Sequence, residues 1–174
     1  MTEEKPASRV QNGHLFLSPV WIRKVAQAVH LARGTDPYFR DLATGFSLKL
    51  ALVIRQIPRS LWTIHGGSQT VTSVWIEKGA VRRIQFSAAP PPGKADCVVV
   101  SDYRAAKRII QGKSSLTGCF LTRQLTVQSN NAYWRRPGLV AKSILAANMV
   151  VRIARQVPTV FGGGRPDRKE DAVA

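Results

Sequence analysis

The residue types that most often perform catalysis or bind metals are few in this 174-residue sequence. The three histidines, His14, His30 and His65, lie far apart and do not have the spacing of metal ligands. The two cysteines, Cys97 and Cys119, each lie in an apolar stretch, which is typical of small buried thiols with little reactivity. No nucleophile has a neighbouring base, so we expect a protein that is not an enzyme and that uses no metal or cofactor.

One short motif resembles a phosphate-binding loop. Gly112-Lys113-Ser114 matches the end of the P-loop pattern, but the glycine required five residues before Gly112 is replaced by Lys107. The motif also follows a predicted helix, whereas a P-loop follows a strand. We therefore exclude a nucleotide-binding loop at this position.

Basic residues are the most prominent chemical feature of the chain. Lys and Arg number 26 against 10 Asp and Glu, which gives a formal charge of +16. Every charged residue from 103 to 166 is basic, and such a stretch is either a solvated surface or a face that meets phosphate groups. On the second reading, the residues predicted to contact an anionic surface are Arg104, Lys107, Arg108, Arg123, Arg135, Arg136 and Lys142.

The compartment is predicted from what the sequence lacks. Its first residues are acidic and polar, unlike a secretory signal. The longest apolar run, residues 139–151, is interrupted by Lys142 and Asn148, so we expect no membrane span. Two cysteines do not form a disulfide scaffold. The expected location is the cytoplasm, with peripheral docking on the inner face of the membrane.

Local signals predict two helices near the N-terminus, after a flexible arm over residues 1–17. Ser18-Pro19 is typical of a helix start, and Gly34 is the expected end. Asp36-Pro37 begins a second, shorter helix that Gly45 should end.

The next region predicts strands. Residues 46–55 alternate between apolar and other side chains, which favours a half-buried strand, although a helix also fits their spacing. Turn signals separate further strands, and four prolines and glycines at 90–93 break the chain. These strands are predicted over residues 61–65, 71–77, 81–86 and 96–100.

The C-terminal half predicts three helices and one strand. Ser101-Asp102 begins a helix that Gly112 ends, and an apolar helix over 116–121 precedes a strand over 124–128. A long apolar helix over 137–156 follows, and residues 159–174 are predicted as a disordered tail. The whole order predicts an α+β domain with a largely antiparallel five-stranded sheet covered by helices.

One pattern of apolar spacing and glycines runs from Ala95-Asp96 through an apolar strand to Ser101-Asp102, and then through a helix ending in Gly112-Lys113 and the apolar helix 116–121. It closes with the strand motif Arg123-Gln124-Leu125-Thr126-Val127-Gln128-Ser129-Asn130. This pattern resembles the sterol carrier protein-2 (sterol-binding) domain family, and the resemblance extends over residues 37–150 and is most specific over 95–131. Arg123 replaces a family glycine at the start of this last strand, and Ser129 or Asn130 replaces another at its end.

The resemblance implies a non-catalytic lipid-binding domain over residues 37–158, with residues 18–36 as an additional N-terminal helix. Its α/β layer would enclose an apolar tunnel for an acyl chain, a sterol, a phospholipid or a quinone-like lipid. Ordinary core packing remains the alternative for its apolar helices. The residues predicted to line the tunnel are Trp62, Phe86, Ile109, Ile110, Leu116, Phe120, Leu121, Val127, Ile144 and Met149.

The predicted function is therefore to bind a lipid and to transfer or present it inside the cell, with the basic surface docked on an anionic membrane. Tyr133 and Trp134, beside two arginines, would suit an interfacial anchor, and packing at a helix start is their alternative. Two other functions remain open. One is nucleic-acid binding, and the other is an accessory subunit that carries a hydrophobic intermediate to enzymes of a lipid, sterol or quinone pathway.

Overall fold

A computed structural model of the chain describes residues 13–88 and 95–162. Its main feature is a five-stranded sheet in which β2 and β5 are parallel and the other neighbouring strands are antiparallel. This confirms the predicted fold class and the strand interpretation of residues 46–55. In sheet order the strands are β4 (Ala80–Ser87), β3 (Thr70–Glu77), β2 (Leu48–Arg55), β5 (Cys97–Asp102) and β6 (Leu125–Ser129).

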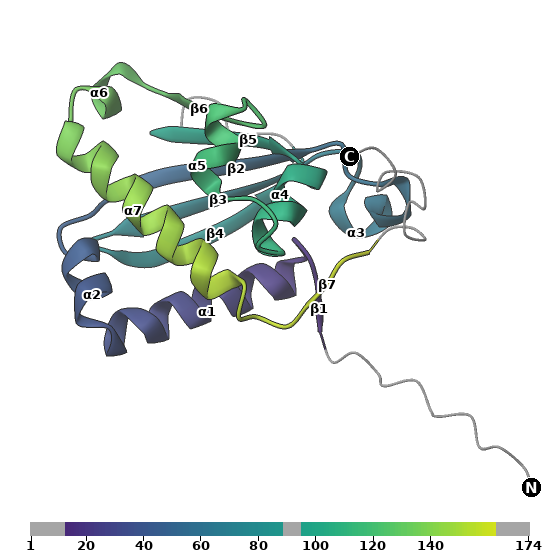
Figure 1. Cartoon of the computed structure of the whole chain (residues 1–174), viewed down its shortest axis with the longest axis horizontal. Helices are drawn as coiled ribbons and strands as arrows, with labels where there is room; N and C mark the ends of the chain where they lie inside the picture. The colour runs from purple at the N-terminus through teal and green to yellow at the C-terminus, as the bar shows by residue number, and fades with distance from the viewer. Residues whose placement is uncertain (1–12, 89–94, 163–174) are drawn as a thin grey trace, which may run out of the picture.

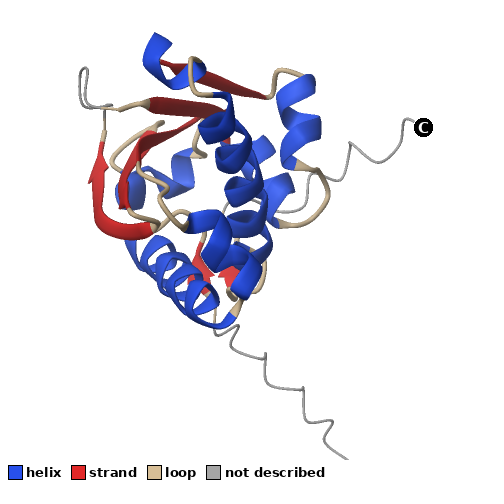
Figure 2. Ribbon diagram, turned by 90° about the vertical axis from the view of Figure 1, so that its left-hand side faces the viewer, coloured by secondary structure: helices blue, strands red, loops and turns tan. Residues whose placement is uncertain are grey.

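Helices cover one face of this sheet (Figures 1 and 2). Four of them begin where the sequence predicts, because a capping side chain accepts a hydrogen bond from a backbone N–H three residues later. The caps are Ser18, Asp36, Asp102 and Ser115. They start α1 (Pro19–Thr35), α2 (Pro37–Ala43), α4 (Tyr103–Ile110) and α5 (Leu116–Leu121), and the long helix α7 spans Pro137–Ala154.

The strand predicted over residues 61–65 is wrong. This segment is helical, with a 3-10 turn η1 (Arg59–Leu61) followed by α3 (Trp62–His65). Leu61 and His65 are the two buried residues of the segment, and a spacing of four places both on the same side of a helix. In a segment of five residues, a spacing of four also fits the alternation of a strand, so the sequence alone did not distinguish a helix from a strand here. A further short helix, α6 (Asn131–Trp134), was not predicted.

The flexible arm predicted over residues 1–17 and the disordered tail predicted over residues 159–174 are both too long, because part of each segment is folded. Strand β1 (His14–Leu15) pairs in parallel with β7 (Thr159–Val160). Phe16, which follows β1, is 1% exposed. Residues 13–17 and 159–162 therefore belong to the packed domain, while residues 1–12, 90–93 and 163–174 lie outside the described residues.

A dense apolar cluster joins the two chain ends to the sheet. We call it the packed end and define it by Phe16, Trp21, Ile54, Leu61 and Tyr103, each of which is at most 5% exposed. The Phe16 ring lies 5.1 Å from the Trp21 ring and 5.5 Å from the Tyr103 ring, measured between centroids. The packed end thus fixes α1 and α4 against β2.

Candidate functional site

The helices bury the sheet face that they cover unevenly: Leu48, Ile54 and Cys97 on this face are buried, and other residues are not. A filled core would bury the central residues of that face almost completely. Several of them are only half-buried, although they come from the middle strands of the sheet. These residues are Leu50 and Leu52 of β2, Val74 of β3 and Val99 of β5. Side chains of α7 such as Leu139 and Val140 pack against them, and we call this contact region between the helices and the sheet face the helix–sheet layer.

Helix α7 sits loosely over this layer. Of its 18 residues only Ala154 is buried, although the helix contacts α1, α2, α4 and α6. Ile144 is 52% exposed and Leu145 is 46% exposed. By length and composition alone, α7 is also the one helix in the described ranges that could cross a membrane. An apolar helix that is this exposed presents lipid-like surface to water.

Large apolar side chains are also exposed on the short helices α5 and α6. Phe120 and Leu121 of α5 and Trp134 of α6 are 47%, 74% and 50% exposed. We define the α5–α7 face by these three residues together with Ile144 and Leu145. Large apolar side chains exposed on three helices make this face a candidate binding surface.

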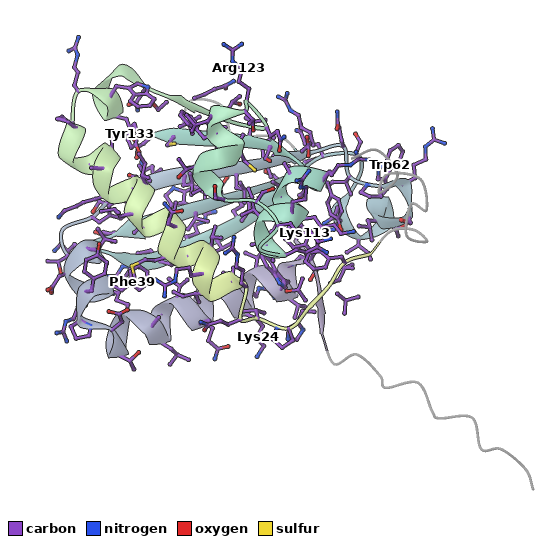
Figure 3. The ribbon with its side chains drawn as sticks, in the orientation of Figure 1. Lys24, Phe39, Trp62, Lys113, Arg123 and Tyr133 are labelled. Atoms are coloured by element: carbon purple, nitrogen blue, oxygen red, sulfur yellow. The ribbon has the colours of Figure 1, made fainter. Side chains whose placement is uncertain are left out.

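The sequence predicts that Tyr133 and Trp134 either anchor the protein at a membrane interface or pack at a helix start, and the structure gives the two residues different surroundings. Tyr133 is buried and packs against Phe46, Leu48 and Cys97, so it is a core residue (Figure 3). Trp134 is half-exposed, and its ring meets the Tyr133 ring edge-on at 5.6 Å. Only Trp134 is therefore available to a surface partner.

The structure brings together part of the predicted tunnel lining. Ile109, Leu116 and Val127 pack in one cluster with the buried Cys119 and Leu125. Ile110 packs instead against the packed end. Phe86 and Met149 are half-buried on β4 and α7.

Four of the ten residues predicted to line the tunnel are exposed on the surface of this structure. Phe120, Leu121 and Ile144 belong to the α5–α7 face. Trp62 is 39% exposed on α3, at the opposite end of the molecule from Tyr133 (Figure 3), and its indole N–H donates to the Ile57 carbonyl. Apolar side chains of a cavity and of an exposed face have the same sequence pattern, so the sequence did not separate them.

The seven predicted basic contacts are exposed, except that Lys107 is half-buried with its Nζ 5.7 Å from the centroid of the Phe161 ring. Arg123, Arg135 and Arg136 follow α5 and α6 directly, and Lys142 lies on α7 itself. These four therefore come from the same segments as the α5–α7 face.

The backbone of Arg123 explains how an arginine can stand where the sterol carrier protein-2 pattern has a glycine. Its φ of 59° is left-handed, which is the conformation that a glycine adopts most easily. Its backbone N–H donates to the Phe120 carbonyl, which closes the end of α5. The backbone thus keeps a glycine-like turn while the side chain adds a positive charge.

Grooves also open on the surface of the described residues, and none of the ten predicted lining residues contributes to the two that follow. The first, of about 400 Å³, lies between α1, α2 and β4. We call it the arginine groove and define it by Arg23, Arg33, Arg82 and Arg83. The second, of about 560 Å³, lies at the start of α4 and includes Asp102, Arg104 and Lys107. The sequence did not predict the arginine groove, because all four arginines lie outside the stretch 103–166 in which every charged residue is basic.

Thiol chemistry is suppressed at the buried cysteine of β5. Burial, assisted by the neighbouring Asp96 carboxylate, raises the pKa of Cys97 to about 11. The thiol therefore stays protonated near neutral pH and is a poor nucleophile. Within residues 13–88 and 95–162, no three His, Cys, Asp or Glu residues gather as metal ligands.

Solved structures with a similar fold include two that match over most of this chain. Sterol carrier protein 2 matches with a TM-score of 0.60 at 20% identity, over 83% of this chain and 99% of that one. The conserved hypothetical protein TT1886 from Thermus thermophilus matches with a TM-score of 0.64 at 17% identity, over 88% of this chain and 98% of that one. No family model and no curated protein matches the sequence. At these identities the likeness establishes a shared fold, as the pattern of residues 95–131 predicted.

Proposed function

We propose that this chain, which has the fold of sterol carrier protein 2, binds a lipid in its helix–sheet layer and exchanges it with anionic membranes through the α5–α7 face. The protein would carry or present the lipid without chemically changing it. Its site of action would be the inner surface of the membrane.

The observation that carries the proposal is the exposure of α5 and α7. Their apolar side chains reach water, and the sheet face that the helices cover includes half-buried residues such as Leu50, Leu52 and Val99. Moving α7 by a small amount would therefore open the layer to a hydrocarbon chain. Each buried methylene of that chain contributes about 0.8 kcal/mol, so a long chain would bind strongly.

Charge favours an anionic bilayer as the partner of this face. Arg123, Arg135, Arg136 and Lys142 are exposed and come from the same helices and their ends. Near an anionic membrane each such charge contributes about 1 kcal/mol, and this attraction falls off within a Debye length. Binding should therefore need anionic lipid and weaken as salt increases.

A lipid-transfer assay tests both parts of the proposal. A fluorescent acyl lipid in donor vesicles is offered to acceptor vesicles of phosphatidylcholine, with or without phosphatidylglycerol, in the presence of the full chain. We expect transfer to be faster with anionic acceptors and to slow at high salt. The Leu121→Ser/Ile144→Ser double variant should transfer at least tenfold more slowly.

A matched control uses exposed apolar residues outside the face. Val20 and Leu31 of α1 are 51% and 61% exposed. The Val20→Ser/Leu31→Ser variant removes similar apolar surface and should keep the wild-type transfer rate. Equal losses in the two double variants, or transfer that is indifferent to anionic lipid, would contradict docking through the α5–α7 face.

A further inference from the structure

We propose that the outer edge of β6 pairs with the same strand of a second copy of this chain, so that the protein forms a symmetric dimer with one continuous sheet. The dimer goes beyond the proposed lipid binding and would form whether or not the chain binds lipid. The occupant of the free sheet edge is thus another molecule of the same protein.

The two edge strands of the sheet are built differently. β4 carries two exposed arginines, Arg82 and Arg83, and a bulge interrupts its register against β3 between Trp75 and Ile76. Charges and bulges are the usual means by which an edge strand avoids pairing with another chain. β6 has neither, because its five residues are uncharged and its register against β5 is unbroken. Only one of the two edges is therefore protected against strand addition.

The outer edge of β6 is open in the described part of the chain. The strand lies last in the sheet and pairs with β5 alone. Thr126 and Gln128 are exposed on one side, whereas Leu125 and Val127 pack on the other side with residues of α5 (Figure 1). Because a shift by one residue would turn the apolar side chains outward, a partner strand must present the same alternation.

The sequence around β6 is complementary to itself. Residues 124–128, Gln-Leu-Thr-Val-Gln, have the same pattern of residue types in both directions from Thr126. In an antiparallel pair of two copies centred on Thr126, Leu125 lies opposite Val127 and Gln124 lies opposite Gln128. Thr126 lies opposite itself, and cross-strand threonine pairs stabilise antiparallel strands. A symmetric pair of this kind needs the same surface patch on both copies, which β6 supplies.

The neighbouring symmetric registers match less well. A slide of two residues in one direction would put Arg123 opposite Val127. The same slide in the other direction would put Leu125 opposite Ser129. Pairing centred on Thr126 therefore best matches apolar with apolar and polar with polar side chains along the strand.

The positive charge of the chain does not oppose this contact at close range. Every residue from 124 to 129 is uncharged, so no two charges meet in the paired segment. The two copies of Arg123 would lie about six residues apart along the pair, or roughly 20 Å, well beyond the Debye length of about 8 Å at physiological ionic strength. The remaining repulsion between two chains of charge +16 is screened by salt, so salt should strengthen the dimer.

Pairing through β6 would place the helices of both copies on the same side of the joined sheet. Leu125 and Val127, which pack with α5, would face each other across the pair, so the covered sides of the two sheets coincide. The two α5–α7 faces would then point the same way and meet one membrane together. Two linked contacts bind more tightly than one, because the second forms at a high effective concentration.

A charge at the centre of the pair tests its register. Thr126→Lys would put two lysines directly opposite each other, whereas Gln128→Lys adds the same charge to the same exposed side opposite Gln124. Sedimentation equilibrium of the full chain should show a dimer for the wild type that strengthens as salt increases. We expect Thr126→Lys to weaken dimerisation by about fivefold and Gln128→Lys by less than about twofold.

A cysteine at the same position reports the contact covalently. In the dimer the two Thr126 Cα atoms would lie about 4.5–5.5 Å apart, a distance that a disulfide spans. Thr126→Cys should therefore give a disulfide-linked dimer with diamide, which takes up the two electrons and two protons that the thiols lose. Gln128→Cys should not, since its two copies would lie roughly 14 Å apart. The native Cys97 and Cys119 are 4% and 2% exposed and should stay reduced.

The outcomes separate the dimer from the proposed function. A wild type that sediments as a monomer at every concentration and salt overturns the dimer and leaves lipid transfer untouched. Equal weakening by the two lysine substitutions, or equal cross-linking of the two cysteine variants, overturns the pairing centred on Thr126. A dimer with the expected variant pattern beside a failed lipid-transfer assay supports the dimer and contradicts only the proposed function.

Discussion

The packed end and the α5–α7 face contain similar apolar residues in opposite surroundings. Phe16 is 1% exposed and makes ring contacts with Trp21, Tyr103 and Phe161. Phe120, on α5, is 47% exposed. One phenylalanine thus holds the domain together, while the other offers apolar surface to a partner.

We infer from this difference that the packed end stabilises the fold and that the α5–α7 face is available to a partner. The packed end ties both described chain ends to β2 and α4, so changes there should act on folding. The α5–α7 face contributes little burial and should tolerate change in solution. Regions of low local stability are the ones that can open to admit a ligand.

The largest effect should come from the centre of the packed end. Phe16→Ala removes a fully buried ring and leaves a cavity among close-packed neighbours. We expect the free energy of unfolding to fall by about 3–5 kcal/mol, measured by urea denaturation followed by tryptophan fluorescence.

Phe120→Ala is the matched substitution on the other side of the comparison. Because this ring is nearly half-exposed, its loss should change stability by less than about 1 kcal/mol. The contrast between the two regions would be refuted by similar losses of stability in the two variants.

A smaller effect should follow from the hydrogen bond that joins α1 to β7. The Trp21 indole N–H donates to the Thr159 Oγ1 at 2.8 Å, next to the β1–β7 pair. Thr159→Val keeps the shape of the side chain but leaves the indole N–H without this acceptor, which should lower stability by about 1–3 kcal/mol. The same denaturation measurement tests it, with Thr122→Val as the control.

Thr122 suits that purpose because its hydroxyl donates to the Gly118 carbonyl at the exposed end of α5. Its loss should leave the unfolding midpoint almost unchanged. A Thr159→Val variant as stable as the wild type would show that this hydrogen bond does not stabilise the attachment of α1 to β7.

Local signals in the sequence located most elements of the fold. Capping side chains mark their helix starts by bonding to the first backbone N–H groups, and such bonds depend only on nearby residues. Alternation over residues 46–55 favoured a strand over a helix, and β2 (Leu48–Arg55) lies within that range. The short helical segment at 59–65 and the pairing of the two chain ends were missed, since neither has enough residues to establish a period.

The candidate site was less predictable because exposure depends on tertiary packing. The pattern of α5 identified an apolar helix but not that Leu121 faces water while Cys119 is buried. Half of the arginine groove could have been predicted, since Arg23 and Arg33 both lie on α1, ten residues apart. Its other half comes from β4 and becomes apparent only when the sheet is assembled.

The smallest predicted effect is a pH dependence at the border of the packed end. His65 is 8% exposed, and its Nε2 is buried without a hydrogen-bond partner. Burial lowers the pKa of His65, partly offset by a hydrogen bond to the Phe16 backbone, so the folded state resists protonation more than the unfolded state does. Stability should therefore be fully present above the unfolded pKa of about 6.5 and decrease as pH falls towards the lower folded value.

Denaturation midpoints of the wild type and of His65→Gln, measured between pH 8 and pH 5.5, isolate this contribution. Glutamine can retain a hydrogen bond to the Phe16 backbone but does not titrate, so the variant should lose less stability than the wild type as pH decreases. The α5–α7 face contains no group that titrates in this range, and the Leu121→Ser/Ile144→Ser variant should keep the full wild-type dependence. An identical pH profile for His65→Gln and the wild type would assign the effect to another residue and show that the border of the packed end accepts a charge.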